Sequence, residues 1–380
     1  MPSSMKANIQ AIAGERGLTV AGLAQRLKTT PSQFRETLAK EKVPEAFIKR
    51  LAHELLVPDY ALFMDKPPHV GGLVDFRERK PSIGGFTRDT AKAIKSARSI
   101  RSAISDIGYD VSGQRLSDLV DGADIDKAAS QLRAYIAIDW AEQAAMKDAR
   151  VFYKALRQRA ESLQLFITQA SFDDGAGFCL SEDSGVDVIT INTKLQSPGR
   201  RLFTLGYEFY HCIINRSGLS DPEVTNNNVE KKCNKFSAEF LAPKDFVRFA
   251  AKRFINNKSL DTSELRRFSS CVKISQYASV IRLHELGFYT DEAVSKWHRI
   301  ISNSHPDVPP KRKGGQPTDQ WKVKLARYGF KFAHVFGAAV EKGDLDNIDV
   351  FRIAQLKPEY QGAYFANAAT ATAQDAEDEE

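Results

Sequence analysis

The sequence predicts an α+β fold that is mostly helical. Apolar residues recur at helical spacing over most of the chain, and Gly and Pro residues break this pattern into short segments. The stretch from about 162 to 193 differs from this pattern. It holds three short segments that are rich in β-forming residues and separated by Gly, Asp and Ser: SLQLFITQASF, GAGFCLSED and DVITINT. We expect these segments to form a small antiparallel sheet of roughly three strands among the helices.

The length of 380 residues indicates several domains, since a domain typically holds roughly 100–200 residues. A hydrophobic content of 42% and a charged content of 27% are ordinary for globular proteins. Changes in composition divide the chain into an N-terminal helical bundle at 1–65, a basic linker with helices at 66–125, the strand-containing domain at 126–305, a helical C-terminal region at 306–365 and a disordered acidic tail at 366–380.

The cysteines and the hydropathy pattern both indicate a cytoplasmic protein. The chain has four cysteines, and they form neither a CxxC pair nor a regular spacing, which argues against a disulfide framework and against a thiolate zinc site. The sequence shows no signal peptide, and no apolar run approaches the roughly 18–20 residues that a membrane span needs. We therefore expect reduced thiols and no membrane partner.

The charge distribution favours polyanions as partners. The formal net charge is +6 although the last six residues include five acids, so the rest of the chain is more basic than the total suggests. A helix beginning near Thr87 would carry Lys92, Lys95, Arg98 and Arg101 three residues apart along one stripe. Such a stripe could follow a phosphate backbone, or it could be an ordinary solvated face.

The most informative segment reads RLFTLGYEFYH and ends at His211; it is followed by VEKKCNKFSAEFLAP. In an HExxH helix two histidines four residues apart bind one zinc ion, and the glutamate after the first histidine serves as general base. Here Tyr207 stands in the place of the first histidine. Glu208 corresponds to the general base and His211 to the second ligand, while Glu230 lies on the next helical segment, where such sites recruit a carboxylate ligand.

These segments resemble the ImmA/IrrE family of zincin-like metallopeptidases, in the form fused to an XRE-type helix-turn-helix. FTLGYEFYH matches the family's FTLAHELGH, EKKCNKFSAEFLAP matches its E-x-x-A-N-x-F-A-A-E-L-L-x-P, and AGFCLSED with ITINT matches its preceding strands. LAQRLKTTPSQF matches the helix-turn-helix pattern and VDFRERK the linker signature. The resemblance makes 1–65 the helix-turn-helix and 126–305 the zincin-like domain.

The departures from the HExxH pattern leave three interpretations. With Tyr207 in place of histidine, only His211 and Glu230 remain as ordinary metal ligands, and bulky Tyr210 precedes the second ligand. The domain is then a pseudo-metallopeptidase without a metal, or a zinc site completed by Tyr207 or another residue, or a motif without a zincin fold. Cys212 and Cys233 are expected to be buried thiols and not ligands, because neighbouring residues on a helix point roughly 100° apart.

The helix-turn-helix resemblance implies DNA contacts from the second helix, at about 31–40. In such a module the second helix enters the major groove and its first residues face the bases. The residues expected to face bases or phosphates are Lys28, Ser32, Gln33, Arg35, Glu36 and Lys40. Gln33 suits adenine and Arg35 suits guanine.

The preferred function is therefore that of a DNA-binding transcriptional regulator that binds double-stranded operator DNA. The resemblance further suggests an antitoxin or mobile-element regulator with a protein partner such as a cognate toxin, and with a homodimer as one assembly. Because Tyr207 stands in the place of the first histidine, we expect no cofactor, with zinc as the alternative. Two alternatives stay open. One is an active zinc endopeptidase that cleaves a repressor or toxin, with Glu208 as catalytic base. The other is a protein-interaction scaffold that binds no DNA.

Overall fold

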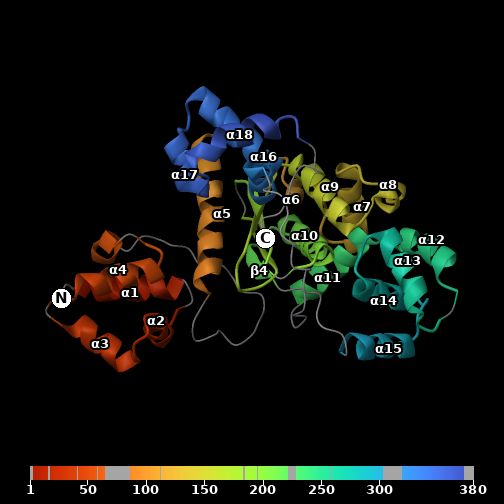
Figure 1. Ribbon diagram of the computed structural model, residues 1–380, viewed down its shortest axis with the longest axis horizontal. Helices are drawn as coiled ribbons and strands as arrows, with labels where there is room; N and C mark the ends of the chain where they lie inside the picture. Colours follow the sequence, from red (N-terminus) through yellow and green to blue (C-terminus); the bar gives the residue numbers. More distant parts are fainter. Residues whose placement is uncertain are drawn as a thin grey trace. The chain divides into compact units, whose positions relative to one another are not determined.

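A computed structural model describes most of the chain, and its contacts divide the chain into two compact units. Unit 1 comprises Met1–Lys95 with Ser171–Asp174, and unit 2 comprises Ser96–Ala170 with Gly175–Glu380 (Figure 1). The residues described are 3–15, 18–40, 42–57, 59–64, 86–111, 113–182, 185–194, 196–220, 228–256, 258–302 and 319–371. The first part of the predicted basic linker, up to residue 85, which includes the VDFRERK segment, lies outside these ranges, and so does the start of the predicted C-terminal region, up to residue 318.

Unit 1 is a bundle of short helices around one apolar core. Its elements are α1 (Ser3–Glu15), α2 (Val20–Arg26), α3 (Pro31–Ala39), α4 (Glu45–Glu54), the 3-10 helix η1 (Asp59–Phe63) and the first turns of α5 (Arg88–Asp106). Each helix contributes apolar residues at helical spacing, so that Leu23, Phe34 and Leu51 are buried together. Thr30 caps α3 through its hydroxyl, and Pro31 occupies the first helical position.

The sheet lies in unit 2 and is mixed, which corrects the expected antiparallel arrangement. Its strands are β1 (Leu165–Ala170), β2 (Gly177–Leu180), β3 (Asp187–Asn192) and β4 (Gly218–Ser220), in the order β1-β3-β2-β4. β3 pairs antiparallel with β2 but parallel with β1. β2 pairs with β3 on one side and with β4 on the other, so the edge that remains for β1 is that of β3 and not that of its sequence neighbour β2.

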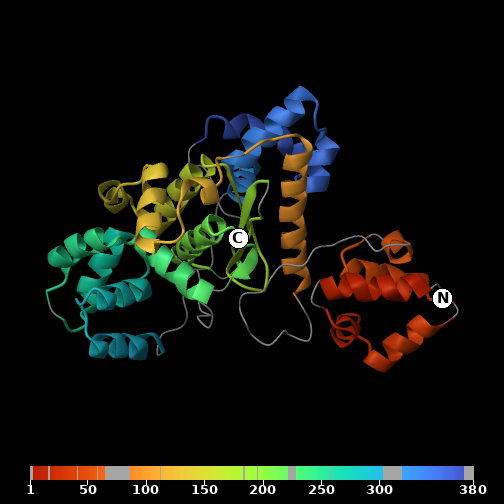
Figure 2. The same cartoon turned by 180° about the vertical axis from the view of Figure 1, so that it is seen from behind.

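Helices cover the sheet and extend unit 2. They are α6 (Leu116–Leu119), α7 (Ile125–Tyr135), α8 (Trp140–Ala145), α9 (Ala149–Glu161), α10 (Pro198–Ile213), α11 (Asn228–Leu241), α12 (Lys244–Phe254), α13 (Thr262–Val272), α14 (Gln276–Glu285) and α15 (Asp291–Ser302). α10 packs on β2, β3, α9 and α11, and so lies between the sheet and the helices that follow (Figure 2). The α+β and mostly helical fold class is confirmed.

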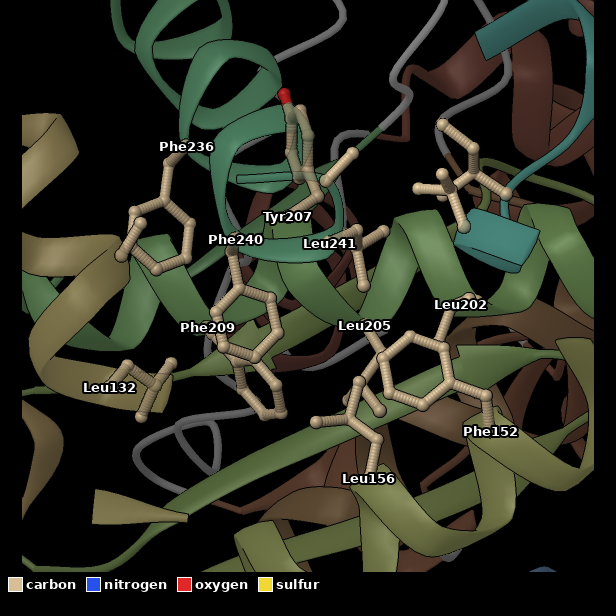
Figure 3. Close-up of a cluster of buried hydrophobic side chains, with 14 of the residues drawn as sticks. Leu132, Phe152, Leu156, Leu202, Leu205, Tyr207, Phe209, Phe236, Phe240 and Leu241 are labelled. Atoms are coloured by element: carbon tan, nitrogen blue, oxygen red, sulfur yellow. The ribbon is translucent and has the colours of Figure 1, made fainter. Parts of the chain in front are cut away.

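The core of unit 2 places α10 at its centre. Leu202, Leu205 and Phe209 of α10 interdigitate with Phe236 and Phe240 of α11 and with residues of α9 (Figure 3). Phe209 and Phe240 meet edge to face, with ring centroids 5.6 Å apart. α10 is therefore buried on nearly every side from Arg201 to Ile213, and the polar side chains of Glu208 and His211 are enclosed by protein.

The C-terminal helices are α16 (Gln320–Lys342), α17 (Asn347–Ala354) and α18 (Pro358–Ala368), and α16 packs on β1 and α18. α16 breaks at Gly329, which has φ 83° and ψ 176°. The carboxylate of Glu161 accepts hydrogen bonds from the backbone N–H groups after the break, at 2.6 Å from Phe330 and 3.0 Å from Lys331.

The last part of the chain departs from the expected disordered tail. α18 continues to Ala368, so the start of the segment 366–380 is helical, while 372–380 lies outside the described residues. Among the helices described, none combines the length and the apolar character that crossing a membrane requires.

Candidate functional site

The HExxH-like residues lie at the interface of α10 and α11. Tyr207, Glu208 and His211 come from α10, Glu230 comes from α11, and all four side chains are completely buried. Tyr207 and His211 lie one turn apart on the same face, with ring centroids 5.3 Å apart. The two helices approach closely because of Gly206, where an added Cβ would come within 2.8 Å of the Ser237 Oγ. The structure therefore brings Tyr207, His211 and Glu230 together, as the motif spacing predicts.

Tyr207 contacts the carboxylate that the motif would assign to the metal. Its hydroxyl donates a hydrogen bond to Oε2 of Glu230. The ring lies at the edge of the apolar cluster, and its oxygen points away from Phe209 and Leu205 (Figure 3). The other carboxylate oxygen of Glu230 lies 3.9 Å from Nε2 of His211. The phenol of Tyr207 thus stands where the motif has a histidine, and it donates a hydrogen bond to Glu230.

Cys233 is a member of this cluster that the sequence reasoning missed. Its Sγ lies 3.5 Å from Nε2 of His211, within hydrogen-bond reach for sulfur. A usable signal was present, since Glu230 and Cys233 are three residues apart and residues at that spacing share a helix face. The expectation of a buried thiol is confirmed, but the thiol has a polar neighbour.

Burial controls the charge of these groups. Desolvation, with a further contribution from the positive charge of Arg216, lowers the pKa of His211 to about 3. Desolvation also raises the pKa of Cys233 well above its usual value, and the negative charge of Glu230 adds to this shift. The imidazole and the thiol are therefore both neutral at neutral pH. Such a pair lacks the thiolate that a cysteine nucleophile requires.

Glu208, the residue corresponding to the general base, extends toward the sheet. A Cβ added at Gly177 of β2 would lie 3.0 Å from its Oε1 and 2.8 Å from Cγ2 of Thr204. Glycine at this position of β2 therefore leaves the space that Glu208 occupies. The negative charge of Glu208 contributes, after burial, to raising the pKa of Cys179 on β2.

The comparison with known families identifies this part of the chain. Residues 147–280 match the family model of the IrrE N-terminal-like domain. The match includes the whole sheet together with α10 and α11, so the ImmA/IrrE part of the resemblance is confirmed. The predicted N-terminal helix-turn-helix lies outside it. No curated protein matches the chain.

The IrrE-like domain does not present a metal-binding arrangement. Among the residues that the structure describes, no group of three or more His, Cys, Asp or Glu side chains is placed so that it could hold a metal ion. Structural and catalytic zinc sites in proteins use at least three protein ligands. His211 and Glu230 are two, the neighbouring thiol of Cys233 is not placed with them as a third ligand, and the hydrogen bond from Tyr207 engages Glu230. The donor set present does not fit a zinc ion.

The remaining residues of the motif serve packing. The ring of Tyr210 packs against that of Phe236 in a tilted arrangement, with centroids 5.1 Å apart, and its hydroxyl donates a hydrogen bond of 3.0 Å to the carbonyl of Gly122. Burial raises the pKa of the Cys212 thiol well above its usual value, and the hydrogen bond with Cys179 adds to the shift. Tyr210 therefore connects α10 to α11 and to Gly122, and Cys212 connects it to β2.

The six residues expected to contact DNA all lie on the surface of unit 1. Exposed side chains at the end of α2 and along α3 include Lys28, Ser32, Gln33, Arg35, Glu36 and Lys40. Lys28 has a left-handed backbone, with φ 56°. The side-chain oxygen of Gln33 accepts a hydrogen bond of 3.0 Å from the backbone N–H of Thr30. Bidentate recognition of adenine by Gln33 would require this capping bond to open.

The basic stripe on α5 has intramolecular partners. Lys95 donates to the carbonyl of Leu56 at 3.1 Å, and Lys92 pairs with Asp89 at 3.2 Å. Further along, the Arg101 guanidinium donates to the carbonyl of Val186 at 3.0 Å. These contacts favour a structural role for the basic side chains of α5 over the binding of a phosphate backbone.

Proposed function

We propose that this chain is a DNA-binding transcriptional regulator whose IrrE-like domain binds a partner or effector and hydrolyses no peptide bond. The observation that carries the second half of the proposal is the hydrogen bond from Tyr207 to Glu230. Hydrolysis by a zincin needs a metal-activated water, and here the ligand carboxylate is engaged by a phenol inside a closed core.

The geometry of α2 and α3 supports the DNA-binding half. Leu23, Leu27, Phe34 and Leu38 are buried in the core of unit 1, and the opposite face of α3 is exposed. This leaves Arg35 accessible on the early turns of a short helix, as in a recognition helix that reads base edges. Arg35 is the strongest candidate for base recognition, because the oxygen of Gln33 is engaged in the capping box.

An exposed aromatic pair supports a protein partner for the IrrE-like domain. Trp140 is 40% exposed and Phe249 is 49% exposed, and their rings meet at a centroid distance of 4.9 Å. Aromatic side chains are enriched at protein interfaces and in their energetic centres. We infer that a protein partner covers this pair. The antitoxin form of the proposal, with a cognate toxin as that partner, rests on the sequence resemblance.

The DNA-binding half is tested by binding of the full chain to the DNA upstream of its own gene. We expect the logarithm of the association constant to fall linearly with the logarithm of the salt concentration, with a slope of roughly −0.9 per phosphate neutralised. Unrelated DNA of equal length should bind more weakly. Absence of salt-dependent binding, or equal affinity for both DNA fragments, would contradict the proposed regulator and favour a scaffold.

An active zinc endopeptidase is the second candidate, supported by the retention of Glu208 and by the 3.9 Å separation of His211 and Glu230. Metal analysis of the purified chain separates the two. Near-stoichiometric zinc that is lost in His211→Ala and in Glu230→Ala would support the enzyme. Its absence from the wild type would support the pseudo-enzyme.

A further inference from the structure

Two side chains of the IrrE-like domain engage the two metal-ligand residues that remain. The hydroxyl of Tyr207 donates to Oε2 of Glu230. The thiol of Cys233 lies 3.5 Å from Nε2 of His211, and this nitrogen is the one that faces Glu230. One partner comes from α10 and the other from α11, so each helix contributes one contact.

Complete burial gives these two contacts their importance. The side chains of His211 and Glu230 have no exposed surface, so water cannot replace a lost partner. A buried carboxylate or imidazole that loses a hydrogen bond pays the full cost of its desolvation. The contacts from Tyr207 and Cys233 therefore stabilise the form of the domain that holds no metal.

The two ligand residues nevertheless keep a separation close to that of a metal site. Two atoms bound at about 2 Å to one tetrahedral zinc ion lie roughly 3.3 Å apart. Nε2 of His211 and Oε1 of Glu230 are 3.9 Å apart, a difference that small side-chain rotations can remove. Among the described residues, no third side chain is placed with these two so that the group could hold a metal ion, and both remaining ligand residues are engaged by other side chains.

We propose that Tyr207 and Cys233 together form a hydrogen-bonded closure that keeps divalent metal from the two remaining ligands, and that a zinc site forms fully only when both are replaced. The proposal rests on the metal-free domain inferred above. It adds that Cys233, as well as Tyr207, keeps the two ligand residues from a metal ion.

The test compares zinc uptake by four full-length proteins: the wild type, Cys233→Ala, Tyr207→His and the double variant. After growth with added zinc and desalting, we expect almost no zinc in the first two and near-stoichiometric zinc in the double variant. The Tyr207→His protein should bind zinc at least tenfold more weakly than the double variant. Zinc should raise the melting temperature of the double variant and leave that of the wild type unchanged.

A serine at position 233 provides the matched control. Its hydroxyl can still hydrogen-bond the imidazole, so Tyr207→His with Cys233→Ser should bind zinc like Tyr207→His alone. Cobalt substitution reports the role of the thiol directly. A sulfur-to-cobalt charge-transfer band in Tyr207→His would show that Cys233 is a ligand and would overturn its assignment to the closure.

The outcomes also separate this inference from the proposed function. Equal zinc affinity of Tyr207→His and the double variant would refute the role of Cys233, whatever the wild type does. Zinc in the wild type would contradict the metal-free domain itself. If the alanine variant fails to fold, Cys233→Val fills a similar volume without a polar atom and replaces it in the same comparison.

Discussion

Lys28 adopts a left-handed backbone conformation directly after the C-cap of α2, with φ 56°. A residue with a Cβ in this conformation costs about 1–2 kcal/mol, which glycine avoids. Lys28→Gly should therefore stabilise the bundle by about 1 kcal/mol, measured as slower amide hydrogen exchange in α2 and α3. Lys28→Ala is the control, since it removes the charge without relieving the backbone. A faster exchange in the glycine variant would contradict this account.

Arg35 and Glu36 are exposed neighbours on α3 with opposite charge. If α3 reads DNA, Arg35→Ala should weaken binding by about 1–3 kcal/mol, because a guanidinium contact to a base is lost. Glu36→Ala should leave binding unchanged or tighten it, because a negative charge near the phosphates is removed. Fluorescence anisotropy on DNA upstream of the gene measures both. Equal weakening by the two substitutions would show that Arg35 of α3 does not contact a base in this way.

Tyr207 and Tyr210 are two buried tyrosines of α10 whose hydroxyl groups have different acceptors. The hydroxyl of Tyr207 donates to a carboxylate, whereas that of Tyr210 donates to the carbonyl of Gly122. Hydrogen bonds to charged groups contribute about 1.5–3 kcal/mol and neutral ones about 1 kcal/mol. Tyr207→Phe should therefore lower the free energy of unfolding by more than Tyr210→Phe does, in urea denaturation. The reverse order would mean that Glu230 does not depend on the phenol.

At the scale of elements, the break in α16 depends on one glycine. Gly329 has φ 83°, and a Cβ there would collide with the carboxylate of Glu161. Gly329→Ala should cost about 3 kcal/mol, from backbone strain and from displacing Glu161. Gly337→Ala in the same helix is the control, because its Cβ would meet Phe365 at an ordinary 3.5 Å. Similar melting temperatures for the two variants would refute the role of the break.

The ion pair of Arg157 and Glu161 explains why α16 breaks at that place. Arg157 donates to Glu161 at 3.1 Å and also to the carbonyls of Ala326 and Ile167. The carbonyl of Ala326 lies before the break, and the N–H groups that Glu161 accepts lie after it. α9 thereby supplies both the donor and the acceptor that the interrupted helix would otherwise lack.

At the scale of the whole molecule, metal removal should have no effect on the wild-type protein. The ligand residues of the IrrE-like domain have hydrogen-bond partners within the chain, so a strong chelator has no structural ion to extract. We expect unchanged melting temperature and unchanged affinity for DNA after dialysis against chelator. A fall in melting temperature that zinc reverses would contradict the metal-free domain and support the peptidase.

Local patterns predicted much of the site. The spacing of Tyr207 and His211 indicates a shared helix face, and α10 has them there. The pattern of Thr30 and Gln33 is that of a capping box, although its consequence for base recognition was overlooked. Strand existence was also predictable, but strand order was not, because nothing within β1 records that it pairs with β3.

The sequence by itself determined the helical class of the chain, its strand segments and the residues that share one face of α10. These features follow from residue spacing within a few turns. Only the tertiary structure decided the central position of β3 and the contact of Cys233 with His211. It also decided that Tyr207 holds Glu230. These depend on how α10, α11 and the sheet pack, and packing joins residues whose separation along the chain carries no periodic signal.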